Sequence, residues 1–224
     1  MEISASTVNV LKNFANINAN IVIKPGNKLM TISEAKNILA EASVPEEFAS
    51  TVGIYDLSEF LNILGLVDKP RVRFEDQYMQ IGGVSGRELV KYYYADTEML
   101  TTPTKPIDMP DADVWFTLDE ATLNGIKRAA AVFGHGQLTI EPNDGSVKLS
   151  VIDPENATAN EYSIQVDGGY ENDKFKFALN IANLRMVSDN YNVKISSKLI
   201  SQFTNESGDL TYWVALEKSS TYGE

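Results

Sequence analysis

Cysteine is absent from the 224 residues, which excludes disulfide bonds, thiolate nucleophiles and cysteine-ligated zinc. Histidine occurs only once, as His135, so a histidine-based catalytic triad would have to use this residue. No apolar run approaches the ~18 residues that a membrane-spanning helix needs. The opening MEISAS is acidic and poor in apolar residues, so no secretory signal is expected. We expect a soluble, cytosolic protein whose 43% hydrophobic residues suffice to build a core.

Basic residues are scarce, since 19 Lys and Arg face 31 Asp and Glu and give a formal net charge of −12. Taken alone, this charge argues against nucleic acid as a partner. The charges are unevenly distributed, however, because no acid lies within residues 6–18, where Lys12 falls on an expected helix. Lys127 and Arg128 fall on a second expected helix whose acids are confined to its first turn. An acidic protein can therefore carry one basic inner surface.

A helix that leads into a β-hairpin is expected twice in the chain. In residues 6–32 the apolar spacing predicts a helix with Ser6 as its N-cap, followed by two short strands that turn at Pro25-Gly26-Asn27. In residues 117–152, Thr117 and Glu120 resemble a capping box and Gly134 ends the helix. The hairpin there turns at residues 142–145. Leu11-Lys12 aligns with Ile126-Lys127, which indicates an internal repeat.

A second pair of short helices is expected at residues 55–67 and 177–187, each followed by strands. The order of helix, hairpin, short helix and strands thus occurs twice. The sequence predicts an α+β fold of two similar domains, each with two helices packed on antiparallel sheet. The polar tail from Ser219 is expected to fray.

The proline-rich segment of residues 100–112 is the clearest linker, because proline fixes φ and removes a backbone donor. We expect domains at residues 1–104 and 113–224, joined by a linker at residues 105–112.

No pattern assembles a nucleophile, a base and an orienting group, so we expect no enzyme, no metal and no cofactor. His135 resembles a solvated residue at a helix end. Residues 82–86 lack the Lys-Ser/Thr of a phosphate loop and predict a hairpin turn. Asp108, Asp111 and Asp113 lack the glycine and distant glutamate of a calcium loop. Residues 92–94 are three consecutive tyrosines, which could stack bases, although at least one of them must face the core.

Five segments spread along the chain resemble the sliding clamps of T-even-type bacteriophages, the processivity factors of the phage replicative polymerase. They are LKNFANIN at residues 11–18, IYDLSEFLNILGLV at 54–67, Lys105-Pro106-Ile107, FALNIANLRM at 177–186 and WVALE at 213–217. Their order and spacing follow the family over nearly the whole length.

The resemblance implies the DNA-clamp fold and a homotrimeric ring around duplex DNA. It also implies that the ring binds the duplex without sequence preference. It implies DNA-facing cations at Lys12, Lys127, Arg128 and Arg185. It also implies a pocket for apolar partner peptides, for which the candidates are Ile107, Met109, Tyr212 and Leu216. The implied partners are the DNA polymerase, an ATP-dependent clamp loader and late transcription factors, in the cytoplasm of the infected bacterial host.

Two alternatives remain open from the sequence. A two-domain, β-rich structural protein of a phage tail or capsid would share the acidity, the repeat and the strands. An enzyme whose site has no recognisable motif is the other.

Overall fold

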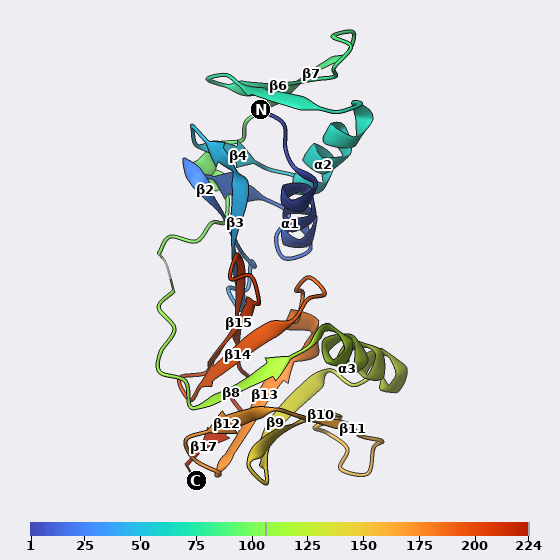
Figure 1. Ribbon diagram of the computed structural model, residues 1–224, viewed down its shortest axis with the longest axis vertical. Coiled ribbons are helices and arrows are strands. Elements are labelled where there is room, and N and C mark those ends of the chain that lie inside the picture. The colour runs from blue at the N-terminus through green and yellow to red at the C-terminus, as the bar shows by residue number, and fades with distance from the viewer. Residues whose placement is uncertain (106, 224) are drawn as a thin grey trace. The chain divides into compact units, whose positions relative to one another are not determined.

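The computed structural model describes residues 1–105 and 107–223 (Figure 1). Pro106, in the expected linker, and Glu224, the last residue of the expected second domain, lie outside the described residues. The chain divides into two compact units, Met1–Lys105 and Pro106–Glu224. Described residues between Met99 and Val114 form no helix or strand.

The N-terminal unit packs two helices against short antiparallel strands (Figure 1). Its elements are α1 (Ala5–Ala15), β1 (Ile21–Ile23), β2 (Gly26–Ile32), β3 (Ile38–Phe48), β4 (Val52–Ile54), α2 (Leu57–Leu66), β5 (Arg71–Phe74), β6 (Tyr78–Gly82), β7 (Leu89–Tyr93) and a 3-10 turn (Thr97–Met99). The strands pair as β1-β4, as β2-β3 and as β5-β6-β7.

Both expected helices of this unit are confirmed, but the first begins earlier than predicted. Ser4, not Ser6, is the N-cap of α1, and its hydroxyl accepts from the Thr7 backbone N–H at 3.2 Å. Leu11 and Phe14 are buried and fix α1 against the core. Asp56 caps α2 in the same way through the Glu59 N–H.

A buried carboxylate fastens the start of α1 to β3. Glu46 is 7% exposed, and its two oxygens accept from the Ser4 N–H and from the Thr7 hydroxyl. Burial works to raise the pKa of Glu46, but the hydrogen bonds from Thr7 and Ser4 outweigh it, so the pKa lies below its ordinary value of 4.5. The ionised form of Glu46 therefore stabilises the docking of α1.

The hairpin predicted at Pro25-Gly26-Asn27 is wrong in its pairing. The chain does turn there, with Gly26 at φ 113°, but β1 pairs with β4 and β2 pairs with β3. The short sequence separation favoured a local partner, whereas the strands take partners further along the chain. The turn predicted at residues 82–86 is confirmed, because β6 and β7 pair on either side of it.

The C-terminal unit places one α-helix against an antiparallel sheet. Its elements are β8 (Val114–Leu118), α3 (Glu120–Phe133), β9 (Gln137–Asn143), β10 (Ser146–Ile152), β11 (Tyr162–Val166), β12 (Gly168–Tyr170), β13 (Phe175–Asn180), a 3-10 turn (Ile181–Asn183), β14 (Tyr191–Ser196), β15 (Ile200–Asn205), β16 (Leu210–Ala215) and β17 (Thr221–Tyr222). The strand orders are β11-β10-β9-β13-β17 and β12-β8-β14-β15-β16. The helix α3 packs on β10 and β11.

The second helix predicted for this unit, at residues 177–187, is wrong. Its first part is strand β13, in which Phe177 pairs with Ile140 and Leu179 pairs with Leu138 of β9. Asn180 then accepts from the Ala182 N–H and starts the 3-10 turn. An apolar run of this length fits a buried strand as well as a helix, and pairing with β9 decides between them.

Two further expectations are corrected at the ends of elements. Asp119, not Thr117, caps α3, because Thr117 is already paired with Asn192 in the sheet. The tail from Ser219 is not frayed, since Thr221–Tyr222 pairs with β13 and the Tyr222 ring stacks on Phe177 at 6.0 Å. Gly134 does end α3, in the left-handed conformation at φ 72°.

Both tryptophans of the chain lie in one cross-strand row of the C-terminal unit. The register places Trp115 beside Lys194, Lys194 beside Gln202, and Gln202 beside Trp213. The Trp115 indole lies on the backbone of Gly169, where an added Cβ would come within 2.9 Å of the ring. A larger residue at position 169 would therefore force the indole to shift.

Replacement of Glu46 tests the anchoring of α1. Glu46→Gln should lower the free energy of unfolding at neutral pH by about 1.5–3 kcal/mol, the usual contribution of hydrogen bonds to a charged group. Because the pKa of Glu46 is lowered in the folded state, its stabilisation is present above the unfolded pKa and is lost as the pH falls through the folded pKa. The difference between wild type and variant should therefore shrink in acid.

Urea unfolding measured across that pH range checks this, with the exposed neighbour Glu47→Gln as the control. An equal loss of stability in both variants, or a difference that does not change with pH, would contradict the anchoring role.

Candidate nucleic-acid interface

The exposed face of α1 is polar and carries a single charge, which is positive. Lys12 lies in its last turn, its first turn has no acid, and Asn9 and Asn16 are also exposed. Amide and ammonium groups are suited to donating hydrogen bonds to phosphate oxygens without reading bases.

The two cations of α3 differ in their surroundings. Arg128 is exposed, whereas Lys127 is half-buried and its Nζ donates to the Met186 carbonyl at 3.3 Å. Burial lowers the pKa of Lys127, because the charged form loses hydration. Lys127 therefore holds a neighbouring segment, while Arg128 presents its charge to solvent.

The segment that Lys127 holds runs along one side of α3. At the first turn, the Glu120 N–H donates to the Asn190 side chain at 3.0 Å. One turn on, the Ser188 hydroxyl donates to the Asn124 side chain at 3.1 Å. Together with the Lys127–Met186 bond, these interactions fall at positions 120, 124 and 127, which share one face of a helix.

This segment brings Arg185 to α3. Arg185 directly precedes Met186, is exposed, and its Nε donates to the Ala182 carbonyl at 3.0 Å. The structure thus gathers Lys127, Arg128 and Arg185 from two separate parts of the chain. It describes Lys12 separately, on α1 of the N-terminal unit.

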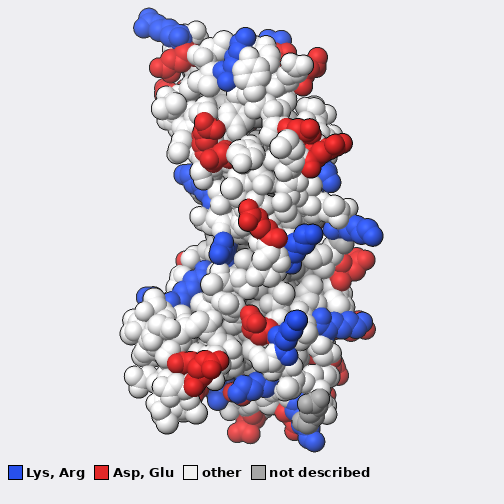
Figure 2. Space-filling view, turned by 180° about the vertical axis from the view of Figure 1, so that it is seen from behind, with Lys and Arg blue, Asp and Glu red and all other residues white. Residues whose placement is uncertain are grey.

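Lys12, Lys127 and Arg128 differ from several other cations in having no ion-pair partner within residues 1–105 and 107–223. In contrast, Lys28 pairs with Glu41, and Arg73 pairs with Glu75. The face drawn in Figure 2 shows Lys and Arg interspersed with Asp and Glu on each unit.

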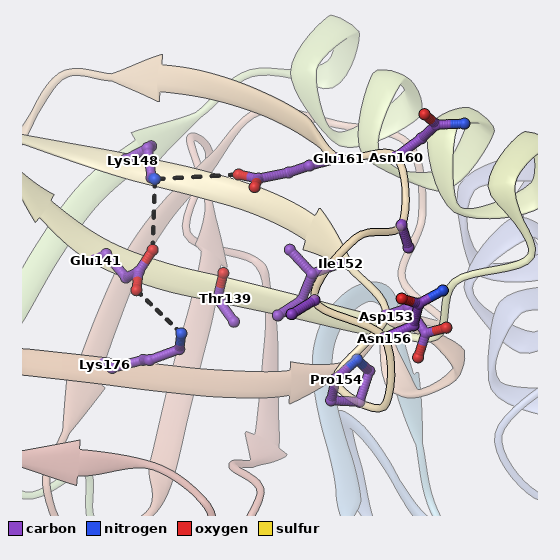
Figure 3. Close-up of a pocket in the computed structure, with 12 residues that line it drawn as sticks. Thr139, Glu141, Lys148, Ile152, Asp153, Pro154, Asn156, Asn160, Glu161 and Lys176 are labelled. Atoms are coloured by element: carbon purple, nitrogen blue, oxygen red, sulfur yellow. Dashed lines mark ion pairs between the residues drawn. The ribbon is translucent and has the colours of Figure 1, made fainter.

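A polar hollow of about 310 Å³ lies over β9, β10 and β13, bordered by the loop after Ile152 (Figure 3). Glu141 lies between two lysines there, 3.2 Å from Lys176 and 3.5 Å from Lys148. Lys148 is also 4.0 Å from Glu161. The charges of both lysines are therefore balanced by carboxylates, and nothing in this hollow forms a nucleophile–base pair.

His135 follows the end of α3, as expected, but it is only partly solvated. It is half-buried, its Nε2 lies 2.8 Å from the Asn160 carbonyl oxygen, and its ring lies 5.6 Å from that of Phe133. The part of the chain that the structure describes contains no group of three His, Asp or Glu side chains able to hold a metal ion.

The candidates for a peptide pocket fall into two groups. Ile107 and Met109 are partly exposed and accessible to a partner. Tyr212 and Leu216 are only 1% and 6% exposed, and Tyr212 contacts the Tyr191 ring in the core. Burial of the Tyr212 hydroxyl raises its pKa.

A hollow of about 190 Å³ in the N-terminal unit was missed by the sequence reasoning. Apolar side chains line it together with two lysines and the start of the proline-rich segment. Its residues are Val22, Lys24, Pro25, Lys28, Met30, Thr102 and Pro103. The signal that could have located it is the lysine and proline cluster at residues 24–28, which we assigned only to a turn.

The fold is that of the sliding clamps. The chain matches the proliferating cell nuclear antigen of Entamoeba histolytica with a TM-score of 0.65, at 14% identity and over 94% of each chain. At this identity the likeness concerns the fold alone.

Comparisons of sequence are more specific. Residues 4–98 match the family model "DNA polymerase processivity factor", and residues 116–218 match "gp45 sliding clamp, C terminal". The sliding clamp of Vibrio phage KVP40 is 30% identical over 97% of this chain and 99% of its own length. Those of Escherichia phage RB69 and Enterobacteria phage T4 are each 29% identical over 99% of both chains.

The chain belongs to the sliding-clamp family of T4-like phages. Sliding clamps of this family are processivity factors of a DNA polymerase, act within the infected cell and are not enzymes. The resemblance seen in the sequence is confirmed, and the alternative of a phage structural protein is not supported. No helix of the described residues has the length and apolarity to span a membrane.

Proposed function

We propose that three copies of this chain close into a ring and that Lys12, Arg128 and Arg185 meet the phosphates of the enclosed duplex. The observation that supports this proposal is that three hydrogen bonds hold the segment following Arg185 along α3, the helix that carries Arg128. Lys127 adds positive charge there and positions Arg185 through Met186.

Weak contacts suit this task. Each neutralised phosphate adds about −0.9 to the slope of log affinity against log salt. A few such contacts per subunit do not read bases and permit movement along the duplex. Closure of the ring, rather than affinity, then prevents escape.

The ring needs a contact between unlike surfaces, and two sheet edges provide them. Strand β7 pairs only with β6, and β11 pairs only with β10, among the described strands. An open edge presents unpaired N–H and C=O groups to another chain. Because β7 and β11 belong to different units of the chain, pairing β7 of one protomer with β11 of the next is head-to-tail, the geometry that builds rings.

Val90 on β7 and Ile164 on β11 supply apolar side chains for this edge-to-edge contact. Both are half-buried in the single chain. Val90 lies on the face of its sheet that includes buried Ile81, and Ile164 is paired with buried Leu149. The joined edges would extend each core into the next protomer.

Partner peptides have their own place on the N-terminal unit. We assign them to the 190 Å³ hollow, where Met30 and Pro103 offer apolar contact and Lys24 offers charge to an acidic or carboxylate end. Ile107 and Met109 follow Pro103 along the linker and remain separate candidates for apolar contact with a partner. Use of one surface by the polymerase, an ATP-dependent loader and late transcription factors implies competition among them in the host cytoplasm.

Charge reversal at the proposed lining tests the first proposal. Arg128→Glu with Arg185→Glu should greatly reduce retention on circular duplex and polymerase processivity, because the enclosed phosphates are then repelled. Arg128→Gln should flatten the salt slope by up to about 0.9 for each phosphate that is no longer neutralised. Sedimentation should still show a trimer, and Lys36→Glu, on an exposed loop, is the matched control. Normal processivity in the double variant would contradict the lining assignment.

Charges at the two edges test ring closure. Val90→Lys or Ile164→Glu alone should shift the protein from trimer to monomer in sedimentation, because one charge is left in an apolar contact. The two changes in one chain place opposite charges across every contact and should restore part of the trimer. Single variants that remain trimeric would show that other surfaces join the protomers.

An acidic side chain introduced into the proposed peptide-binding surface tests partner binding. Met30→Asp and Met109→Asp should each weaken polymerase binding roughly tenfold, the effect of a charge introduced into an apolar hot spot, without change in subunit number. Met99→Asp, at a residue 80% exposed, is the control. Wild-type affinity for loader and polymerase in these variants would place the partner surface elsewhere, and a lack of competition between them would show that they use separate surfaces.

A further inference from the structure

One face of the β5-β6-β7 sheet is packed and the other is open. Val72, Ile81, Met79 and Tyr92 are all at most 8% exposed, and Tyr92 meets the Phe60 ring of α2 at 5.4 Å. In Figure 1 this sheet has α2 on one side, and its other side turns away from the unit. The alternation of strand residues places a different set of side chains on that open face.

The register fixes which residues share the open face. Arg73, Gln80 and Lys91 form one row across the three strands. Tyr78 and Tyr93 form the next row, and Arg71 and Leu89 flank Gly82 in the third. The open face therefore holds two aromatic rings and three cations, one or more from each outer strand.

The two rings form a platform. Their centroids are 5.6 Å apart with an interplanar angle of 51°, and Tyr93 is 65% exposed. The Lys91 ammonium lies 5.0 Å from the centroid of the Tyr78 ring. Lys91 thus holds one ring in place while Tyr93 offers its surface to solvent.

The charge of this face is opposite to that of the chain. Two acids, Glu75 and Asp76, lie in the turn between β5 and β6, and Glu75 is paired with Arg73 at 2.8 Å. At the outer edge of β5 the backbone of Glu2 forms an isolated β-bridge with that of Arg71, and Arg87 and Glu88 lie in the turn between β6 and β7. The three rows themselves hold Arg71, Arg73 and Lys91 and no acid, in a chain of net charge −12.

We propose that this face binds single-stranded DNA. Exposed aromatic rings on a sheet stack the bases of single strands, and neighbouring cations follow the backbone. A duplex keeps its bases stacked inside and offers the rings no partner. An acidic peptide would use the cations but not the pair of rings, so the single strand accounts for more of the face.

This site is separate from the proposed contact with duplex DNA, which uses α1 and α3. A clamp with such a face would hold the unpaired strand at a replication junction while the ring encloses the duplex. The two sites predict different sensitivities to substitution.

Fluorescence anisotropy with the full-length protein tests the proposal. The probe is a labelled oligodeoxythymidine longer than the ~4–16 nucleotides that one such surface covers. Tyr78→Ala and Tyr93→Ala should each weaken binding roughly tenfold, the effect of losing one stacked base. Tyr55→Ala is the matched control, because Tyr55 is 69% exposed in the same unit but lies outside this sheet.

Two further measurements separate the explanations. Tyr93 lies on the edge strand β7, where its substitution could also alter the trimer, whereas Tyr78 lies on the central strand β6. Weaker DNA binding by Tyr78→Ala therefore tests the proposal independently of subunit assembly. Lys91→Gln should also weaken binding, whereas Lys36→Gln should not.

Three results would overturn the proposal: no binding by the wild type, binding lost with Arg128→Gln but not with either tyrosine variant, or displacement of the probe by poly-glutamate as efficiently as by unlabelled oligodeoxythymidine. The second result would place the single-stranded DNA inside the ring, and the third would favour an acidic peptide as the ligand. None of the three results would affect the proposal for duplex DNA.

Discussion

Three hydrogen bonds along one face of α3 set the arrangement of the basic residues in the C-terminal unit. They join Glu120, Asn124 and Lys127 to a segment 59 to 70 residues further along the chain. The buried side chains of Leu184 and Met186 fix the same segment from its other side, so Arg185 is held beside α3. The segment occupies the place where the repeat led us to expect a second helix. The unit thus places Arg185 beside α3 without the second helix that was predicted there.

The sequence was sufficient for the elements whose signals are local. The end of α3 at Gly134 and the turn at residues 82–86 depend on their own neighbours, and the internal repeat was visible as spacing, although the predicted caps Ser6 and Thr117 were each displaced by a nearby residue. Partners distant in sequence were the main source of error. Phe177 and Leu179 lie in a strand because they pair with β9. Ile21–Ile23 pairs with Val52–Ile54 rather than with β2, the next strand along the chain.

The candidate site shows the same division. The resemblance to the phage sliding clamps was enough to name Lys12, Lys127, Arg128 and Arg185 as candidates, and all of them except Lys127 are exposed. Their different environments could not be predicted, because the burial of Lys127 depends on a carbonyl 59 residues away. The role of buried Glu46 could not be predicted either, because nothing in the sequence of a strand shows that one of its acids accepts hydrogen bonds from a distant helix.

Charge segregation in this chain is therefore a property of elements and not of the whole molecule. Both α1 and the open face of β5-β6-β7 are positive within an acidic protein, and opposite charges lie close together elsewhere (Figure 2). A net charge predicts solubility and long-range repulsion, but it does not decide what each face binds.

The shared row of Trp115 and Trp213 has a practical consequence. Both indoles of the chain belong to the C-terminal unit, and the N-terminal unit has none. Intrinsic emission excited at the red edge therefore reports one half of the protomer alone. Spectroscopists can follow the melting of that half while the other half stays optically silent, without attaching a dye.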